Sequence, residues 1–185
     1  MLNMYASKGL LFALAAVPVY LLLRWLYCRK RPRAGLRGEL LRFLFVIFLV
    51  AILSMTIVPD WSFTQYEGEK LGIEVYLRRG PINLIPFRTI AMYLRGHALA
   101  LMNLMGNTIL FIPLGLLPPL IWKKWRRFGT MLPFSLMLPL FIEFVQHFIG
   151  RSSDIDDLIL NALGILLGYA LWLLCVRVAR KRRAP

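Results

Sequence analysis

The segment Leu40–Val58 reads LLRFLFVIFLVAILSMTIV and holds a single charged residue, Arg42. A helix needs about 20 predominantly apolar residues to cross the hydrocarbon core of a bilayer, so this segment predicts a membrane-spanning helix. Four further segments have the same character: Gly9–Tyr27, Ala98–Trp122, Gly129–Ile149 and Leu158–Val178. The sequence therefore predicts an all-α polytopic bundle of about five transmembrane helices.

The overall composition agrees with a membrane protein. Of the 185 residues, 59% are hydrophobic and 17% are charged, whereas soluble domains average about 45–50% apolar and about 25% charged residues. Intrinsic disorder is excluded because disordered chains are poor in large apolar residues. The two cysteines, Cys28 and Cys175, are too few for a disulfide framework, and we interpret them as small apolar side chains.

The net charge of +14 indicates how the helices are oriented. Three blocks hold sixteen Lys and Arg residues against a single acid, Glu39: Arg24–Arg42, Lys123–Arg127 and Arg177–Arg183. By the positive-inside rule these blocks are cytoplasmic, so the N-terminus lies outside and the C-terminus inside. The basic excess thus reports topology and, secondarily, attraction to anionic lipid head groups. No nucleic-acid partner is needed to explain it.

The chain divides into one membrane domain and two flanking parts. Residues 1–39 hold the first expected span and a basic cytoplasmic loop, residues 40–178 the main transmembrane domain, and residues 179–185 a basic cytoplasmic tail. Within the main domain, residues 59–97 form a long connection that the predicted topology places outside.

The external connection contains three segments with distinct patterns. Ile73–Leu77 alternates apolar and polar residues, as an extended strand does. Gly80–Phe87 (GPINLIPF) is apolar but too short to span, and its two prolines exclude a regular helix. We expect it to lie at the membrane interface or to re-enter shallowly, buried against protein. Arg88–Leu94 is expected to form an interfacial helix that leads into the next span.

Polar side chains inside the apolar segments mark the candidate functional site, because charged and amide groups are costly in hydrocarbon. In the fourth expected span, Glu143, Gln146 and His147 share one helix face through their i, i+3 and i+4 spacing. Further polar residues lie near the ends of neighbouring spans: Asn107, Arg151, Asp156, Asp157 and Asn161. With the topology above, all of these ends are outer ends. The sequence therefore predicts one polar cluster that is open to the outside.

Three blocks follow one another between residues 83 and 164. They are Asn83–Phe87 (NLIPF); Gly106–Gly115 (GNTILFIPLG); and Ile142–Gln146 (IEFVQ) with Arg151, Asp156–Asp157 and Asn161–Gly164 (NALG). Together they resemble the VanZ-like family of bacterial membrane proteins, which is named for a glycopeptide (teicoplanin) resistance protein. The resemblance covers Leu40 to Tyr169. It implies an envelope function at the bacterial plasma (inner) membrane, with glycopeptide resistance known for a few members, and it implies no settled catalytic mechanism.

Several of these residues also have a purely structural interpretation. Gly164 and Gly168 are best interpreted as a small-residue face that lets two helices approach closely. Asp154 or its neighbour Ser153 is suited to cap the last span. Asp156 and Asp157 would then complement the positive end of that helix dipole, a stabilisation of about 0.3–1 kcal/mol.

Glu143 is the residue for which a functional role is most specifically predicted. A carboxylate at the centre of a spanning helix costs about 2.5–3.5 kcal/mol, so Glu143 should be protonated, paired or facing water. Arg88 and Arg151 are alternative partners. Such a pair either locks the helix order or belongs to a site for the polar head of an envelope lipid. We predict no metal site, although Glu143, Asp156 and Asp157 offer the oxygen ligands that Ca²⁺ prefers.

These features predict a site that binds an envelope lipid or a lipid-linked precursor, and the resemblance implies a contribution to glycopeptide resistance. The alternatives are a membrane-embedded lipid-modifying enzyme that uses Glu143 or Asp157 as a general base, and a non-catalytic scaffold or small transporter. A nucleophile elbow, a P-loop and a dinucleotide fingerprint are all absent from the sequence, so no cofactor is predicted. The sequence leaves open whether the protein catalyses a reaction and which oligomeric state it adopts. The candidate ligand-binding or polar-cluster residues are Asn83, Pro86, Arg88, Asn107, Glu143, Gln146, Arg151, Asp156, Asp157 and Asn161.

Overall fold

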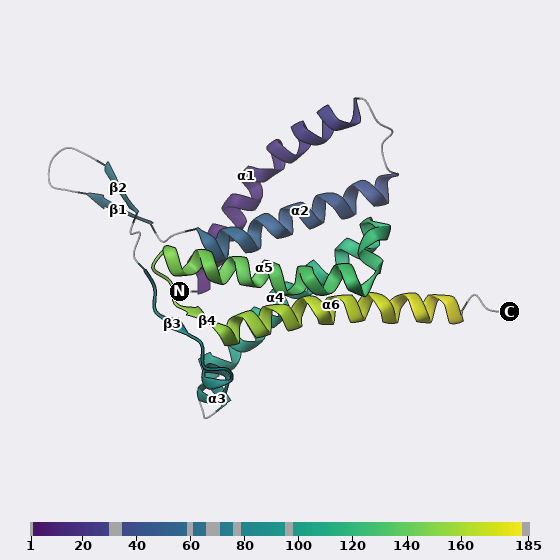
Figure 1. The fold of residues 1–185 in the computed structure, drawn as a ribbon. Helices are drawn as coiled ribbons and strands as arrows, with labels where there is room; N and C mark the ends of the chain where they lie inside the picture. The colour runs from purple at the N-terminus through teal and green to yellow at the C-terminus, as the bar shows by residue number, and fades with distance from the viewer. Residues whose placement is uncertain are drawn as a thin grey trace.

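Five long helices make up most of the structure, a computed structural model that describes residues 2–29, 35–58, 61–65, 71–75, 79–94 and 98–182. They are α1 (Leu2–Cys28), α2 (Leu36–Ile57), α4 (Ala98–Ile121), α5 (Phe128–Phe148) and α6 (Ile155–Lys181). The axes of α2, α5 and α6 lie roughly alongside one another, with α6 running opposite to α2 and α5, while α1 diverges from them (Figure 1). The predicted all-α bundle is confirmed.

The lengths of these helices fit a membrane. Four are long and apolar enough to cross a bilayer, namely residues Gly9–Cys28 of α1 and the whole of α2, α5 and α6. Within the described part of the chain, α4 contributes a shorter apolar segment, Met105–Ile121. Many of their large apolar side chains remain exposed, including Leu14, Leu23 and Phe144 at 60–63%. Such a surface suits lipid rather than water.

Glycines bring α4 and α6 together. A Cβ atom at Gly164 would lie 2.2 Å from the carbonyl oxygen of Thr108, and one at Gly168 would lie 2.0 Å from that of Ile112. On α4, Gly115 makes the reciprocal close approach to α6. No real side chain fits in these spaces, so the two backbones meet only because the Cβ atoms are missing.

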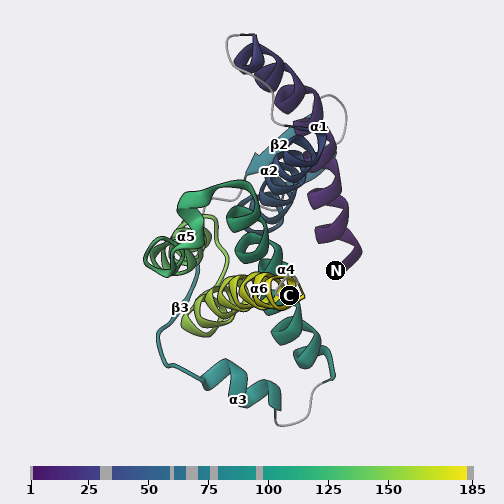
Figure 2. The ribbon, with the colours of Figure 1, turned by 90° about the vertical axis from the view of Figure 1, so that its right-hand side faces the viewer.

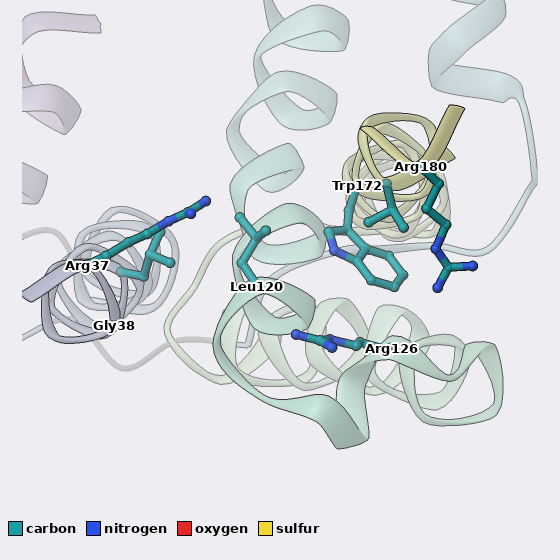
Figure 3. A pocket seen from close by; sticks show the side chains of 8 residues that line it. Arg37, Gly38, Leu120, Arg126, Trp172 and Arg180 are labelled. Atoms are coloured by element: carbon teal, nitrogen blue, oxygen red, sulfur yellow. The ribbon is translucent and has the colours of Figure 1, made fainter. Parts of the chain in front are cut away.

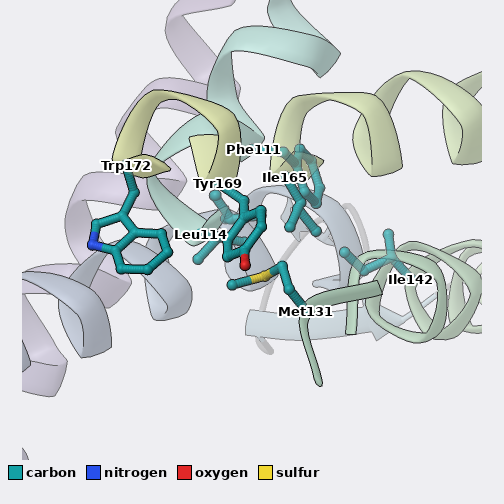
Figure 4. Close-up of a cluster of buried hydrophobic side chains, with 8 residues drawn as sticks. Phe111, Leu114, Met131, Ile142, Ile165, Tyr169 and Trp172 are labelled. Carbon is teal, nitrogen blue, oxygen red and sulfur yellow. The ribbon is translucent and has the colours of Figure 1, made fainter. Parts of the chain in front are cut away.

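A hydrophobic cluster fills the space between the helices. Figure 4 shows Phe111 and Leu114 of α4, Met131 of α5, and Tyr169 of α6 gathered in this cluster. The hydroxyl group of Tyr169 donates a hydrogen bond of 2.8 Å to the carbonyl oxygen of Arg126. The complete cluster of buried residues is Ile52, Phe111, Leu114, Met131, Ile142, Ile165, Tyr169 and Trp172.

The connection between α2 and α4 carries short regular elements. Strands β1 (Trp61–Gln65) and β2 (Leu71–Val75) pair antiparallel, with Trp61 opposite Val75. The expected extended segment is therefore confirmed for Ile73–Val75, while its residues 76 and 77 lie outside the described residues. The expected interfacial helix is present as α3 (Arg88–Leu94).

The Gly80–Phe87 stretch is attached to the α5–α6 connection through its backbone. Strand β3 (Ile82–Asn83) pairs in parallel with β4 (Ser153–Asp154). The expectation that this stretch is buried against protein is wrong for its side chains, because Leu84, Ile85 and Phe87 are 57–71% exposed. Strand β4 pairs the backbone polar groups of β3. Burial of the side chains is therefore not needed to satisfy the backbone, and the apolar side chains face outward.

The two ends of the bundle differ chemically. We call the end that holds the C-terminal ends of α1 and α6, the N-terminal end of α2 and the 3₁₀ helix η1 (Lys123–Arg126) the basic end. The opposite end, with β3, β4 and α3, is the strand end. Figure 2 views the molecule from the basic end, with α6 seen along its axis beside α4 and α5.

An ion-pair group at the basic end joins α1 to α2. Arg24 donates two hydrogen bonds to the carboxylate of Glu39, at 2.6 and 2.5 Å, and Arg42 adds a third at 3.2 Å. Arg24 and Arg42, which the sequence places near the ends of spans, thus share the acid of the first basic block.

Candidate functional site: a polar cluster at the strand end

Asp154, the last residue of β4, precedes α6 and links three elements. Its Oδ1 atom accepts a hydrogen bond of 2.9 Å from the backbone N–H of Asp156, which makes Asp154 the N-cap of the helix. Its carboxylate also accepts from the side-chain amide of Asn83 on β3 at 3.1 and 3.2 Å. The hydroxyl group of Thr89 on α3 donates to the same carboxylate at 2.5 Å. One side chain therefore ties β3, α3 and α6 together.

Asp156 is fully buried and binds the backbone at the start of α3. Its carboxylate accepts hydrogen bonds from the N–H groups of Phe87 at 2.5 Å, Thr89 at 2.7 Å and Ile90 at 3.1 Å. The first N–H groups of a helix have no partner inside the helix, so Asp156 caps α3 from a distant part of the chain. Phe87 adopts a left-handed backbone with φ 63°, and the bond to Asp156 helps to hold it in this unfavourable conformation.

Glu143 lies buried on α5, with 4% of its surface exposed. Its Oε2 atom accepts a hydrogen bond of 2.8 Å from the backbone N–H of Asp154. The guanidinium of Arg151 donates to the carbonyl oxygens of Met55 at 2.9 Å and Thr56 at 3.2 Å, at the C-terminal end of α2. The structure thus gives Glu143 a backbone partner and directs Arg151 toward α2.

Gln146 and His147 fix the C-terminal end of α5. The side-chain amide of Gln146 donates to the carbonyl oxygen of Thr56 at 3.2 Å. The Nδ1 atom of His147 lies 2.9 Å from the carbonyl oxygen of Gly80, whose own N–H donates to the carbonyl oxygen of His147 at 2.7 Å. A Cβ atom at Gly80 would lie 1.7 Å from the carbonyl oxygen of Arg151, so only glycine permits this approach.

Asp157 and Asn161 occupy one face of α6, a single turn apart. The side-chain amide of Asn107 on α4 donates a hydrogen bond of 2.6 Å to Oδ1 of Asp157. Asn161 is 4% exposed, and its Oδ1 atom is buried without a hydrogen-bond partner among the described residues. Leaving such an acceptor unsatisfied costs about 1–3 kcal/mol. Asn161 therefore marks a place where a hydrogen-bond donor would be accepted.

The structure brings the predicted polar residues to one end of the bundle. The contacts above join Asn83, Asn107, Glu143, Gln146, Arg151, Asp156 and Asp157 to neighbouring elements at the strand end, and Asn161 lies one turn further along α6. Pro86 and Arg88 lie at the start of α3 with exposed side chains. Across the described ranges, no group of three His, Cys, Asp or Glu side chains is arranged to hold a metal ion.

Sequence reasoning missed Thr89 and the role of Gly80. Thr89 donates its hydroxyl group and its N–H to two different aspartates, yet a threonine after an arginine carries no pattern of its own. In the sequence, Gly80 is only the first residue of an apolar stretch whose prolines exclude a regular helix. Both roles arise from contacts with α6 and with the α5–α6 connection.

Comparison with known protein families gives a match over most of the chain. A family model described as VanZ/LLP1 matches residues 43–176, a range that contains α4, α5, most of α6 and the whole polar cluster. No match is found among curated proteins or among solved structures.

Proposed function

The chain belongs to the VanZ/LLP1 family, and from this premise we propose that it binds the polar head of an envelope lipid or lipid-linked precursor at the strand end. The family and the apolar helices make it a membrane protein with several spanning helices. We place it in the bacterial plasma membrane with the strand end outside, because basic residues concentrate at the opposite end.

The proposal rests on the unpartnered Oδ1 atom of Asn161 next to Asp157 and Asn107. A buried amide oxygen and a nearby carboxylate both accept hydrogen bonds, so the complementary ligand presents N–H or O–H donors. Sugar hydroxyls, amines and peptide amides of envelope lipids and precursors have this chemistry. Glu143 adds a third acceptor at the same end of the bundle.

The surroundings of the cluster are suited to a lipid-borne ligand. Leu84, Ile85 and Phe87 expose apolar side chains beside β3 and α3, and such residues dip into the boundary between head groups and acyl chains. Asp154 and Asp156 meanwhile hold β3, α3 and α6 in fixed positions. A site held by such supporting hydrogen bonds loses little entropy when a ligand binds.

Lipids that co-purify with the full-length protein test the proposal. We expect mass spectrometry to find an envelope lipid or lipid-linked precursor that is enriched with the wild type and depleted at least several-fold with Asp157→Asn and Glu143→Gln. Each amide keeps an oxygen that can accept the structural hydrogen bond seen here, so folding should be preserved.

Glu39→Gln is the matched control, because it removes a carboxylate at the basic end. Identical lipid profiles in the wild type and all three variants would rule the proposed site out. Glycopeptide susceptibility of cells that express the same variants provides the physiological readout, and we expect any protection to fall with the lipid signal.

A further inference from the structure

A separate concave site lies at the basic end. It is a pocket of about 620 Å³ bounded by α2, α4, η1 and α6. Each of three elements contributes an arginine to its lining: Arg37 from α2, Arg126 from η1 and Arg180 from α6. Figure 3 shows Arg37 and Arg126 extending toward Leu120 from different sides, with Arg180 beyond Trp172.

The charge of this pocket is uncompensated within its own lining. All of its charged lining residues are arginines, and the nearest acid in sequence, Glu39, is already bound by Arg24 and Arg42. Arg126 donates to the carbonyl oxygen of Pro119 through Nε, at 3.0 Å, so within the described residues its terminal nitrogens remain as donors. The lining therefore favours an anion.

The rest of the lining is hydrocarbon. Leu41, Leu120, Trp172 and Val176 form apolar walls beside the arginines. A free phosphate ion would gain nothing from such walls, whereas an amphiphile contacts both parts. Trp172 also lies in the half of α6 nearest the basic end, a little over two turns before Arg180, and tryptophan is enriched near lipid head groups.

We propose that this pocket binds an anionic phospholipid of the surrounding bilayer, with its phosphate among Arg37, Arg126 and Arg180 and the start of an acyl chain along Leu41 and Val176. Basic pockets between spanning helices recognise anionic head groups in this way. The site is independent of the polar cluster and lies at the other end of the helices. It is built partly from residues outside the family match, since Arg37, Leu41 and Arg180 fall beyond residues 43–176.

Native mass spectrometry of the full-length protein in detergent tests this site, with phosphatidylglycerol as the anionic probe. A single basic residue near a membrane surface contributes about fivefold to the attraction of an anionic lipid. We therefore expect Arg37→Gln combined with Arg180→Gln to weaken phosphatidylglycerol binding by about tenfold or more. The matched control combines Arg177→Gln with Lys181→Gln, which removes the same charge from exposed positions outside the pocket lining. We expect it to change binding less than twofold.

Two further probes separate a lipid site from a simple anion site. Phosphatidylcholine, whose head group has no net charge, should bind at least tenfold more weakly than phosphatidylglycerol, and glycerol 3-phosphate should not displace the bound lipid. Equal losses in the two double variants, equal binding of both lipids, or displacement by glycerol 3-phosphate would each overturn the proposal. If the double variant fails to fold, Arg37→Gln and Arg180→Gln alone should each weaken binding by about fivefold, and unchanged binding in both would contradict it.

Discussion

Glu143 on α5 accepts a hydrogen bond of 2.8 Å from the backbone N–H of Asp154, the residue that caps α6. A buried carboxylate in a spanning helix is thereby matched to a backbone donor at the start of the next helix. This contact fixes the position of α6 relative to α5, and it holds the carboxylate within the polar cluster, where it is buried.

Substitution of Glu143 should separate its structural role from its charge. Glu143→Gln retains an oxygen for the Asp154 N–H and should change the free energy of unfolding little. Glu143→Ala leaves that N–H unpaired and should destabilise the protein by about 1–3 kcal/mol. Thermal unfolding in detergent measures the difference. Equal stability of the two variants would show that the hydrogen bond contributes nothing.

Removal of the Asp156 carboxylate should loosen α3. Three backbone N–H groups depend on this side chain, so Asp156→Ala should speed amide hydrogen exchange at Thr89 and Ile90 by at least tenfold. Asp157→Asn serves as the control, because Asp157 contacts α4 through Asn107 rather than α3. Unchanged exchange in Asp156→Ala would show that α3 does not need its remote cap.

A methyl group at Gly168 should disrupt the contact between α4 and α6. Its Cβ atom would lie 2.0 Å from the carbonyl oxygen of Ile112, and overpacking of this kind typically costs about 1–3 kcal/mol. Gly106→Ala on α4 is the control, because a Cβ atom there meets nothing within 4 Å and alanine favours helix. We expect Gly168→Ala to lower the unfolding temperature and Gly106→Ala to leave it unchanged or raise it.

The orientation of the helices is open to a direct test. Reporter fusions after Lys124 and after Arg183 should read as cytoplasmic, and a reporter inserted within residues 66–70 should read as external, because the basic blocks favour the cytoplasmic side. The opposite pattern would move the polar cluster to the cytoplasmic face and remove the basis for an envelope ligand there.

The sequence predicts the helices of this protein closely. Each of the five expected spans is a helix, and α3 has the bounds expected for it. Long apolar runs interrupted by basic blocks leave few alternatives, because every backbone group within lipid must be paired inside its own segment. The same reasoning predicts that Glu143, Asn107 and Asn161 lie at one end of the bundle, because successive spanning helices alternate in direction and their lengths determine which helix ends lie together.

The partners inside the polar cluster were not predictable in this way. The sequence offers Arg88 and Arg151 as partners for Glu143, and it gives no sign that the backbone N–H of Asp154 donates to this carboxylate. Asp156 is a candidate ligand residue by composition, yet it binds backbone N–H groups from a segment 66–69 residues earlier. These contacts depend on the parallel pairing of β3 with β4, and two-residue strands leave no periodic signal.

The pairing of β3 with β4 also has a consequence for biosynthesis. The amide of Asn83 and the N–H groups of Phe87 and Thr89 emerge from the ribosome well before Asp154 and Asp156, which accept their hydrogen bonds. During translation these donors lack their aspartate acceptors until α4 and α5 have been synthesised. The polar cluster is therefore assembled last, and a nascent chain that stops before α6 lacks the acceptors that complete it.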